Sequence, residues 1–572
     1  MICRRRRVPA VARFTTALSL AAILWVEPAP AQVPPTASPV PEGSPIPRLL
    51  PPAPPSTVPG ITVPPLPTPG ELPTGTVAVT HVAIDGVTAY APAAMGRLVQ
   101  DLTGPAVPLA RIETARLAIL QRYRADGYVF TGVDADIEDG QLRFVVTEGH
   151  IVSVRLEGEI GPAGAQVLRF LKRLTEEPVI DVATLERYLL LAQDVPGVTL
   201  HAVLQPVTGE PGALALVAQV ERKPVSGLAT IDNRAFNEIG PVETLGVVDV
   251  NSLSRFGEKT EISYYHAFPD SENFGQASVE TFIGDSGLKL RAFGGQGAID
   301  PTGSLGAIDY HGLTTVFGGL ASYPVIRSRQ RNLTLFAGFD GLDSTVNIEG
   351  LRLSYDAVRA FRLGGEFAAS DLLLGAERSA TDDLTMRFSQ GAPILGATAD
   401  GTSPTAARLG EQASFSKLDL AVSRRQTLFT PWDGASMAVL ALVTGQWTPD
   451  ILPPSEQFYL GGANFTRGYY SGEVLGDKAL AATAELQLDT APLGIASQWY
   501  VFYDWGQTWQ NEASDFATII HAAGGGVRTA LTSNVELDLG ALERFNRFPT
   551  GTGAGVSPLR AAAFYWRVLT RF

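Results

Sequence analysis

The sequence predicts a transmembrane β-barrel of about 16 antiparallel strands that follows two small α+β domains. Three observations support this fold class: an export-type N-terminus, a β-α-α-β-β pattern that occurs twice over residues 76–224, and alternating apolar and polar runs over residues 225–572. No segment after the N-terminus offers about 18 consecutive apolar residues, the length that a membrane-spanning helix needs. Strands would therefore have to cross the membrane.

The N-terminus has the layout of a secretory signal peptide over residues 1–31. Its three parts are a basic stretch, an apolar stretch and a small-residue cleavage site: Arg4–Arg13, Phe14–Val26 and Ala29-Pro30-Ala31. A short membrane anchor is the alternative. Cleavage would remove five arginines, one glutamate and Cys3, which changes the net charge from −14 to −18. The mature chain would then contain no cysteine, so disulfides and thiolate metal sites are excluded.

The composition also excludes several classes of function. The chain is acidic and has no basic block beyond its N-terminus, so we expect no nucleic-acid partner. The six histidines are scattered, and the sequence has neither a G-K dipeptide for a phosphate-binding loop nor a GxSxG serine elbow. We therefore expect no catalytic, cofactor-binding or metal-binding residues and do not expect an enzyme.

Residues 32–75 form a proline-rich linker. Sixteen prolines occur among the 43 positions from 33 to 75. Each proline removes an N–H donor and fixes φ, so neither a sheet nor more than a turn of helix should form. We expect a semi-extended spacer, with a ligand for a proline-binding module as the alternative.

Two α+β domains are expected at residues 76–149 and 150–224. In the first domain we predict strands and helices at Val77–Ile84, Ala93–Leu102, Ala110–Arg124, Gly132–Ile137 and Gln141–Thr147. In the second domain the same order gives Ile151–Leu156, Ala163–Leu174, Val182–Ala192, Thr199–Val207 and Leu214–Glu221. The repetition of one unit of about 75 residues indicates a tandem pair.

Residues 225–572 alternate with the two-residue period of strands. Trp499, Val501 and Tyr503 alternate with Tyr500, Phe502 and Asp504, and the last strand places Trp566 and Phe572 on the face opposite Arg567 and Arg571. Aromatic-rich apolar faces opposite carboxylates fit lipid outside and a polar lumen inside. At roughly 20 residues per strand and connection, this stretch holds about 16 strands. A β-propeller or a secreted array of β-sandwiches is the structural alternative. The terminal Phe572 is typical of a bacterial outer-membrane barrel.

The ordered set of motifs resembles one family. The motifs are Leu117–Gly158, Asp232-Asn233-Arg234, Arg255-Phe256-Gly257-Glu258, Thr466-Arg467-Gly468-Tyr469 and Phe502-Tyr503-Asp504-Trp505-Gly506. Together they resemble the two-partner secretion transporters, the hemolysin activator and secretion proteins, whose small periplasmic domains are called POTRA domains. The fourth motif has Thr where the family pattern V-R-G-[FY] has Val, whereas the fifth fits the pattern F-x-D-x-G in full.

The resemblance assigns a functional clasp. It implies that a loop over residues 461–479 enters the lumen and that Arg467 pairs with Asp504, with Gly468, Tyr469 and Gly506 as the other motif residues. The physical reason is that a guanidinium away from bulk water needs an anion, which a carboxylate supplies bidentately. The alternative is that Arg467 is a solvated loop charge and Asp504 one of many lumen carboxylates. Trp566 and Phe572 are the expected C-terminal signal for barrel assembly.

The function that follows from the resemblance is protein secretion. We expect a bacterial outer-membrane pore whose POTRA domains, in the periplasm, bind an adhesin- or hemolysin-like exoprotein by adding its strand to an exposed sheet edge at Val198–Val207 or Thr131–Ile137. Further partners would be outer-membrane lipid and the barrel assembly machinery. A plug helix seen in some relatives is not expected from residues 32–75. The alternatives are a factor that inserts other barrels and a passive diffusion porin.

Overall fold

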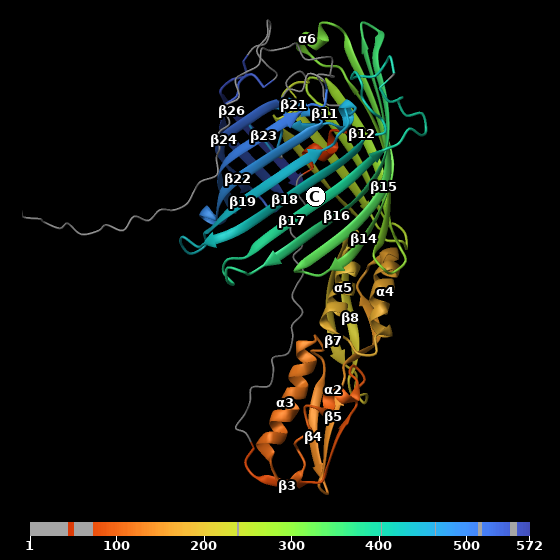
Figure 1. Ribbon diagram of the computed structural model, residues 1–572, viewed down its shortest axis with the longest axis vertical. Helices are drawn as coiled ribbons and strands as arrows, with labels where there is room; N and C mark the ends of the chain where they lie inside the picture. The colour runs from red at the N-terminus through yellow and green to blue at the C-terminus, as the bar shows by residue number, and fades with distance from the viewer. Residues whose placement is uncertain are drawn as a thin grey trace, which may run out of the picture.

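The computed structural model describes residues 44–50, 73–236, 239–401, 403–463, 465–512, 517–549 and 558–572. It consists of a barrel with an arm of two small domains below one side of it (Figure 1). The predicted signal peptide, and the linker apart from residues 44–50 and 73–75, lie outside the described residues. Within the described residues, no helix combines the length and the apolar character needed to cross a membrane.

The first domain, at the tip of the arm, has two sheets. Its elements are β1 (Thr76–Val79), β2 (His81–Asp85), α2 (Pro92–Gly96), β3 (Gly104–Pro108), α3 (Leu109–Ala125), β4 (Gly132–Glu138) and β5 (Gln141–Thr147). Strand β5 lies between β2 and β4, and β1 pairs with β3. The core beneath α3 contains Ile119, Tyr123 and Phe144, each fully buried.

Two predictions for the first domain are wrong in detail. The single strand expected at Val77–Ile84 is two strands in different sheets, because the main-chain N–H and the hydroxyl of Thr80 both donate to the Gly140 carbonyl and break the run. The helix expected at Ala93–Leu102 ends at Gly96. Beyond it the chain makes isolated i→i+3 turns that place Val99 and Leu102 in the core.

The second domain has one three-stranded sheet with two helices on one face. Its elements are β6 (His150–Glu157), η1 (Gly161–Ala163), α4 (Gly164–Lys172), η2 (Arg173–Glu176), α5 (Val182–Gln193), β7 (Val198–Pro206) and β8 (Ala213–Arg222), with β8 in the middle. The Asp181 side chain caps α5 by accepting the Thr184 N–H at 2.9 Å. The edge strands of the two three-stranded sheets are β2 and β4 in the first domain and β6 and β7 in the second.

The rest of the chain is a closed barrel of 16 antiparallel strands, which confirms the predicted fold class. In sheet order from β9, the strands are β9 (Val225–Asp232), β10 (Glu243–Asn251), β11 (Lys259–Ala267), β12 (Glu272–Ile283), β13 (Leu288–Ile299), β14 (Tyr310–Arg327), β15 (Arg331–Ile348), β16 (Leu351–Asp371), β17 (Ala380–Gly391), β18 (Ser416–Phe429), β19 (Ser436–Trp447), β22 (Lys478–Thr490), β23 (Ser497–Trp509), β24 (Ala517–Ala530), β25 (Val535–Arg544) and β26 (Ala562–Arg571). Pairing of β26 with β9 closes the ring.

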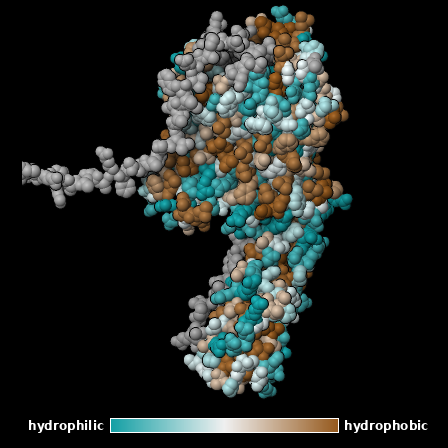
Figure 2. Space-filling model, viewed as in Figure 1, coloured by the Kyte–Doolittle hydropathy of each residue, from teal (hydrophilic) through white to brown (hydrophobic). Residues whose placement is uncertain are grey.

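The strands alternate between an apolar outer face and a polar lumen. On β23, the side chains of Trp499 and Val501 are exposed on the outside, whereas Tyr500 and Asp504 are buried within. Figure 2 shows hydrophobic residues over the flank of the barrel that faces the viewer. This arrangement satisfies every strand by pairing and leaves an apolar wall for lipid.

The second domain is fastened to one rim of the barrel. The ring of Phe282, at the end of β12, packs edge-on against Phe170 of α4 at 5.2 Å between centroids. Arg327, at the end of β14, donates to both carboxylate oxygens of Asp194 at 2.6 and 2.8 Å. Arg187 of α5 donates to the Pro324 carbonyl at 2.9 Å. The helices α4 and α5 therefore lie against the turns that follow β12 and β14 (Figure 1).

A single helical turn, α1 (Ile46–Leu49), lies inside the barrel (Figure 1, red). Ile46 is 2% exposed and belongs to a cluster with the lumen-facing residues Leu245, Val247 and Tyr265. The length of α1 fits the expectation that the proline-rich segment forms no more than a turn of helix. A segment that precedes both small domains thus contacts the lumen-facing surface of β10 and β11.

Candidate functional site

The loop between β19 and β22, residues 448–477, folds back into the lumen. It contains a hairpin of β20 (Phe458–Leu460) and β21 (Val474–Gly476), so the expected segment 461–479 forms its tip, the returning strand and the start of β22. Gly461 begins the tip with φ of +105°, and a Cβ there would lie 1.9 Å from the Tyr470 carbonyl oxygen. Only glycine allows this close approach, which turns the chain toward the wall.

The tip brings Arg467 to Asp504. Both Asp504 carboxylate oxygens accept bonds from Arg467: Oδ2 from its main-chain N–H at 2.8 Å and from Nε at 2.9 Å, and Oδ1 from Nη2 at 2.9 Å. The Asp504 side chain is 0% exposed and that of Arg467 is 9% exposed. The guanidinium also lies 3.7 Å from the centroid of the Phe502 ring. This is a bidentate, buried ion pair of the kind in which loss of one partner leaves an uncompensated charge.

A second carboxylate extends the ion pair along the wall. Glu485 of β22, 1% exposed, accepts a bond from Nη1 of Arg467, and its other oxygen accepts Nη1 of Arg528 at 2.7 Å. Arg528 lies over the ring of Tyr500 at 4.0 Å, and the Tyr500 hydroxyl donates to Asp538 at 2.8 Å. Sequence reasoning missed Glu485 and Arg528. Their one signal was their place in alternating strands, which the other lumen-facing polar residues of the barrel share.

The remaining motif residues form the seat of the tip. A Cβ on Gly468 would lie 2.4 Å from the Ala522 Cβ, so the loop backbone rests directly on the wall. The Gly468 carbonyl accepts a bond from Nε of Arg544. Tyr469 is 1% exposed, and its hydroxyl lies within 3.0 Å of two main-chain carbonyls. A Cβ on Gly506 would approach Thr466 at 2.8 Å. Gly468 and Gly506 thus remove the bulk that would hold the loop away.

Trp566 lies on β26, the strand that closes the barrel, and Phe572 directly follows that strand; both are away from the clasp. The main-chain N–H of Trp566 donates to Asn233 at 2.9 Å, and Phe572 exchanges two main-chain bonds with Gly227 at 2.9 and 3.0 Å. The Phe572 side chain is 48% exposed. The structure therefore places Phe572 at the outer face of the seam between β26 and β9.

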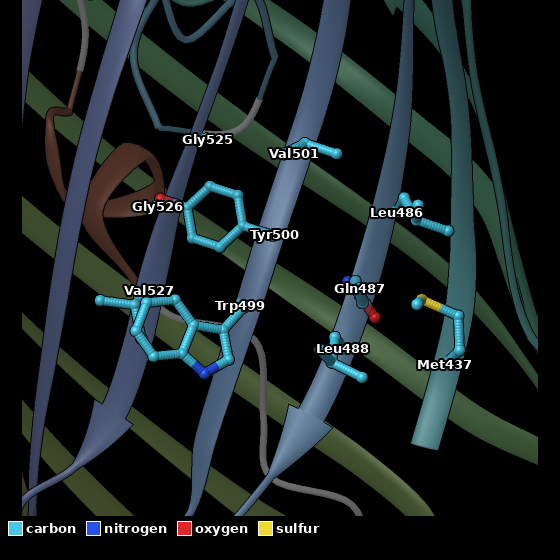
Figure 3. A pocket seen from close by; sticks show the side chains of 10 residues that line it. All are labelled: Met437, Leu486, Gln487, Leu488, Trp499, Tyr500, Val501, Gly525, Gly526 and Val527. Carbon is cyan, nitrogen blue, oxygen red and sulfur yellow. The ribbon is translucent and has the colours of Figure 1, made fainter. Parts of the chain in front are cut away.

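The outer wall beside the clasp has a hollow of 520 Å³ over β19, β22, β23 and β24 (Figure 3). Leu486, Trp499 and Val501 border it, and Gly525 leaves its floor without a side chain. None of its lining residues is charged. Within the part of the chain that the structure describes, no three His, Cys, Asp or Glu side chains gather as metal ligands. The contacts that build the clasp are ion pairs and hydrogen bonds.

Comparison with known proteins relates both parts of the chain to one family. Residues 213–529 match the haemolysin secretion/activation proteins ShlB/FhaC/HecB, and residues 77–149 match the ShlB-type POTRA domain. Among solved structures, CdiB from Escherichia coli is 19% identical, with a TM-score of 0.68 over 91% of this chain and 94% of that chain. CdiB from Acinetobacter baumannii is 15% identical, with a TM-score of 0.63 over 90% and 94%. No curated protein sequence matches.

Proposed function

We propose a mechanism for this chain from the premise that it belongs to the haemolysin secretion/activation protein family ShlB/FhaC/HecB. It is an outer-membrane pore of two-partner secretion, its POTRA domains lie in the periplasm, and its partner is a secreted exoprotein. The family is one of secretion channels, not of enzymes. The steps below describe how this chain would recognise its partner and control the pore.

The observation that carries the mechanism is the loop 448–477 inside the lumen. Its tip is fixed to the wall by the buried pair of Arg467 and Asp504 and by Glu485. A polypeptide can pass only after this loop moves aside or rearranges. The clasp therefore holds the pore closed until the partner arrives, and Gly468, Tyr469 and Gly506 shape the seat to which the loop returns.

Recognition of the partner is assigned to the sheet edges of the POTRA domains. Strands β4 and β7 both lie at edges, where unpaired main-chain groups can accept an additional strand. On β7 the side chain of Val203 is 54% exposed, which offers an apolar contact beside the main-chain bonds. The partner would arrive extended and unfolded, and its folding outside the cell would drive translocation without nucleotide hydrolysis. An adhesin- or hemolysin-like protein fits this role.

Two further partners are proposed for the barrel. Lipid would cover its apolar flank, and the cellular barrel assembly machinery would insert it. Trp566 on the closing strand and Phe572 directly after it would be the signal. We propose no catalytic residue, cofactor, metal ion or nucleic acid in the mechanism.

Deleting residues 76–149 tests partner recognition. The variant should still insert in the outer membrane, because the second domain and its contacts with the barrel remain, but secretion should fall strongly. A sharper pair is Val203→Lys on β7 and Val152→Lys on β6, the two edges of one sheet, since a lysine discourages strand addition. Val152 is 41% exposed and is thus a matched control. Secretion at the parental level from both the deletion and Val203→Lys would contradict the mechanism. The partner is identified as the protein lost from the medium when this chain is absent.

A further inference from the structure

A second buried ion-pair cluster lies above the clasp, at the extracellular end of the lumen. Its centre is Arg408, on the loop 392–415 that connects β17 to β18, and its side chain is only 2% exposed. Nη1 and Nη2 of Arg408 donate to Asp477 at 2.7 and 3.1 Å, and Nε and Nη2 donate to Glu512 at 3.1 and 2.8 Å. We call Arg408, Asp477 and Glu512 the outer latch.

The outer latch joins three extracellular connections through one guanidinium. Asp477 ends the luminal loop 448–477, and its carboxylate also accepts the main-chain N–H of Leu452, near the start of that loop, at 3.0 Å. Glu512 belongs to the connection from β23 to β24, whose Asn511 N–H donates to Asp477 at 2.8 Å. Asp477 is 0% exposed. The Asp477 carboxylate thus contacts both ends of the luminal loop and, through Arg408, links them to the loop 392–415.

The loop 392–415 is itself folded down over the top of β16. The Ala407 N–H donates to Asp356 at 3.3 Å, and the Tyr355 N–H donates to the Thr405 carbonyl at 2.8 Å. Phe415 and Leu452, both 0% exposed, share an apolar cluster. Arg408 therefore projects from a segment with its own attachment to the wall, so that it can act as a fixed point for the luminal loop.

A third contact of the luminal loop shows why the outer latch is different. Glu456 accepts bonds from Arg362 of β16 at 2.6 Å and from Lys417 of β18 at 2.8 Å. Both cations stand on barrel strands, so this contact fastens the loop to the rigid wall. The outer latch instead fastens it to two extracellular connections, which a molecule outside the cell can reach.

We propose that Arg408 is a positioning residue of the pore: through Asp477 it holds both ends of the luminal loop, so that displacement of the extracellular loop 392–415 releases the loop that the clasp seats in the lumen. The inference rests on the proposed function in one respect, that the luminal loop leaves its seat. It adds that the release can be controlled from the cell exterior, by a residue outside the motif.

The test measures exposure of the luminal loop without any partner protein. The sequence has one cysteine, at position 3 in the predicted signal peptide, so Ser471→Cys introduces a single thiol into the luminal loop. Ser471 is 6% exposed and replacement by cysteine is nearly isosteric. The labelling rate with a membrane-impermeant maleimide, on the full chain in the outer membrane, then reports how often the loop leaves its seat. Heat-modifiable migration of the barrel checks that each variant is folded.

In the Ser471→Cys background, Arg408→Ala should accelerate labelling at least about tenfold, because a buried carboxylate loses its charged partner. Arg408→Lys should restore part of the protection, since lysine keeps the positive charge but cannot donate the paired hydrogen bonds of a guanidinium. The control is Arg387→Ala, which breaks a more exposed, lumen-facing arginine–aspartate pair of β17 and β18 at 2.9 Å, away from the luminal loop. The arginine side chain of this pair is 45% exposed.

The outcomes separate this inference from the proposed function. Fast labelling of Arg408→Ala with slow labelling of Arg387→Ala supports the outer latch. If Arg467→Ala labels fast while Arg408→Ala labels like the parent, the outer latch is overturned and the clasp stands. If Arg467→Ala also labels like the parent, the clasp of the proposed function fails as well. Equal acceleration by Arg387→Ala and Arg408→Ala would mean general loosening of the lumen and would overturn the specific role of Arg408.

Discussion

Replacing Asp504 by alanine should release the luminal loop from the barrel wall. Asp504 accepts three hydrogen bonds from Arg467, one from the main chain and two from the guanidinium, at 2.8 to 2.9 Å. The substitution removes both acceptor oxygens, and with them all three hydrogen bonds, and leaves the guanidinium buried. Glu485 still contacts Nη1 of Arg467, so the cation keeps one of its two anions.

The magnitude follows from these contacts. A bond to a charged group contributes about 1.5–3 kcal/mol, and breaking a buried ion pair from one side costs about 3–5 kcal/mol. Because Glu485 remains, the seated state should lose about 3 kcal/mol, which shifts the ratio of seated to released loop roughly a hundredfold. Asp504→Asn keeps one acceptor oxygen and should give an intermediate shift.

Single-channel recording of the purified chain in planar bilayers measures this shift as the fraction of time spent in conducting states. Asp419→Ala is the control, because Asp419 is a lumen carboxylate that pairs with Arg387 and not with the loop. The order of conducting fractions should be Asp504→Ala, then Asp504→Asn, then the parent together with Asp419→Ala. If both Asp504 variants match the parent, the clasp does not hold the loop, and the energetic reasoning is refuted.

Two further predictions concern the seat of the loop and the first POTRA domain. Gly468→Ala should raise the conducting fraction because its Cβ would lie 2.4 Å from that of Ala522, whereas Gly246→Ala, whose Cβ meets nothing within 4 Å, should match the parent; equal recordings from the two variants would contradict this. Burial alone would raise the pKa of Glu148, but hydrogen bonds from Thr88 and Tyr123 and from main-chain N–H groups lower it below 4.5. A lowered pKa means that this stabilisation is present above about pH 4.5 and is lost as the pH falls below it. Hydrogen exchange should therefore show the first domain opening at acid pH, and Glu148→Gln should weaken that pH dependence; an unchanged profile would argue against it.

The fold could be predicted from the sequence because its signals are periodic. Alternation along β23 separates Trp499 and Val501 from Tyr500 and Asp504. Because lipid lies outside and polar groups lie inside, the first set faces outward and the second faces the lumen. One error occurred where a hydrogen bond overrides periodicity. Thr80 divides an apparently continuous strand because it donates a hydrogen bond to Gly140, 60 positions away. The local sequence pattern does not predict such a long-range contact.

The clasp and the outer latch differ in how far the sequence reveals them. Arg467 and Asp504 lie within two short motifs, so the resemblance could pair them. Glu485 lies in no such motif, and acidic residues that alternate with apolar residues occur throughout the barrel. Arg408 and Asp477 are 69 positions apart and belong to two different connections between barrel strands. Their pairing depends on how extracellular loops fold together, which neither propensity nor alternation determines.

The second small domain is attached to one side of the barrel, opposite the wall that carries the clasp. Its contacts reach the turns after β12 and β14, the fourth and sixth strands of the ring counted from β9, whereas Asp504 lies on β23, the thirteenth. In a ring of 16 strands these positions are nearly diametrically opposite. A partner polypeptide that passes from the second small domain into the barrel would thus enter along one wall, whereas the clasp is fastened to the opposite wall. The wall along which the partner enters and the wall that holds the clasp need not share any side chain. Each could therefore change during evolution without disturbing the other.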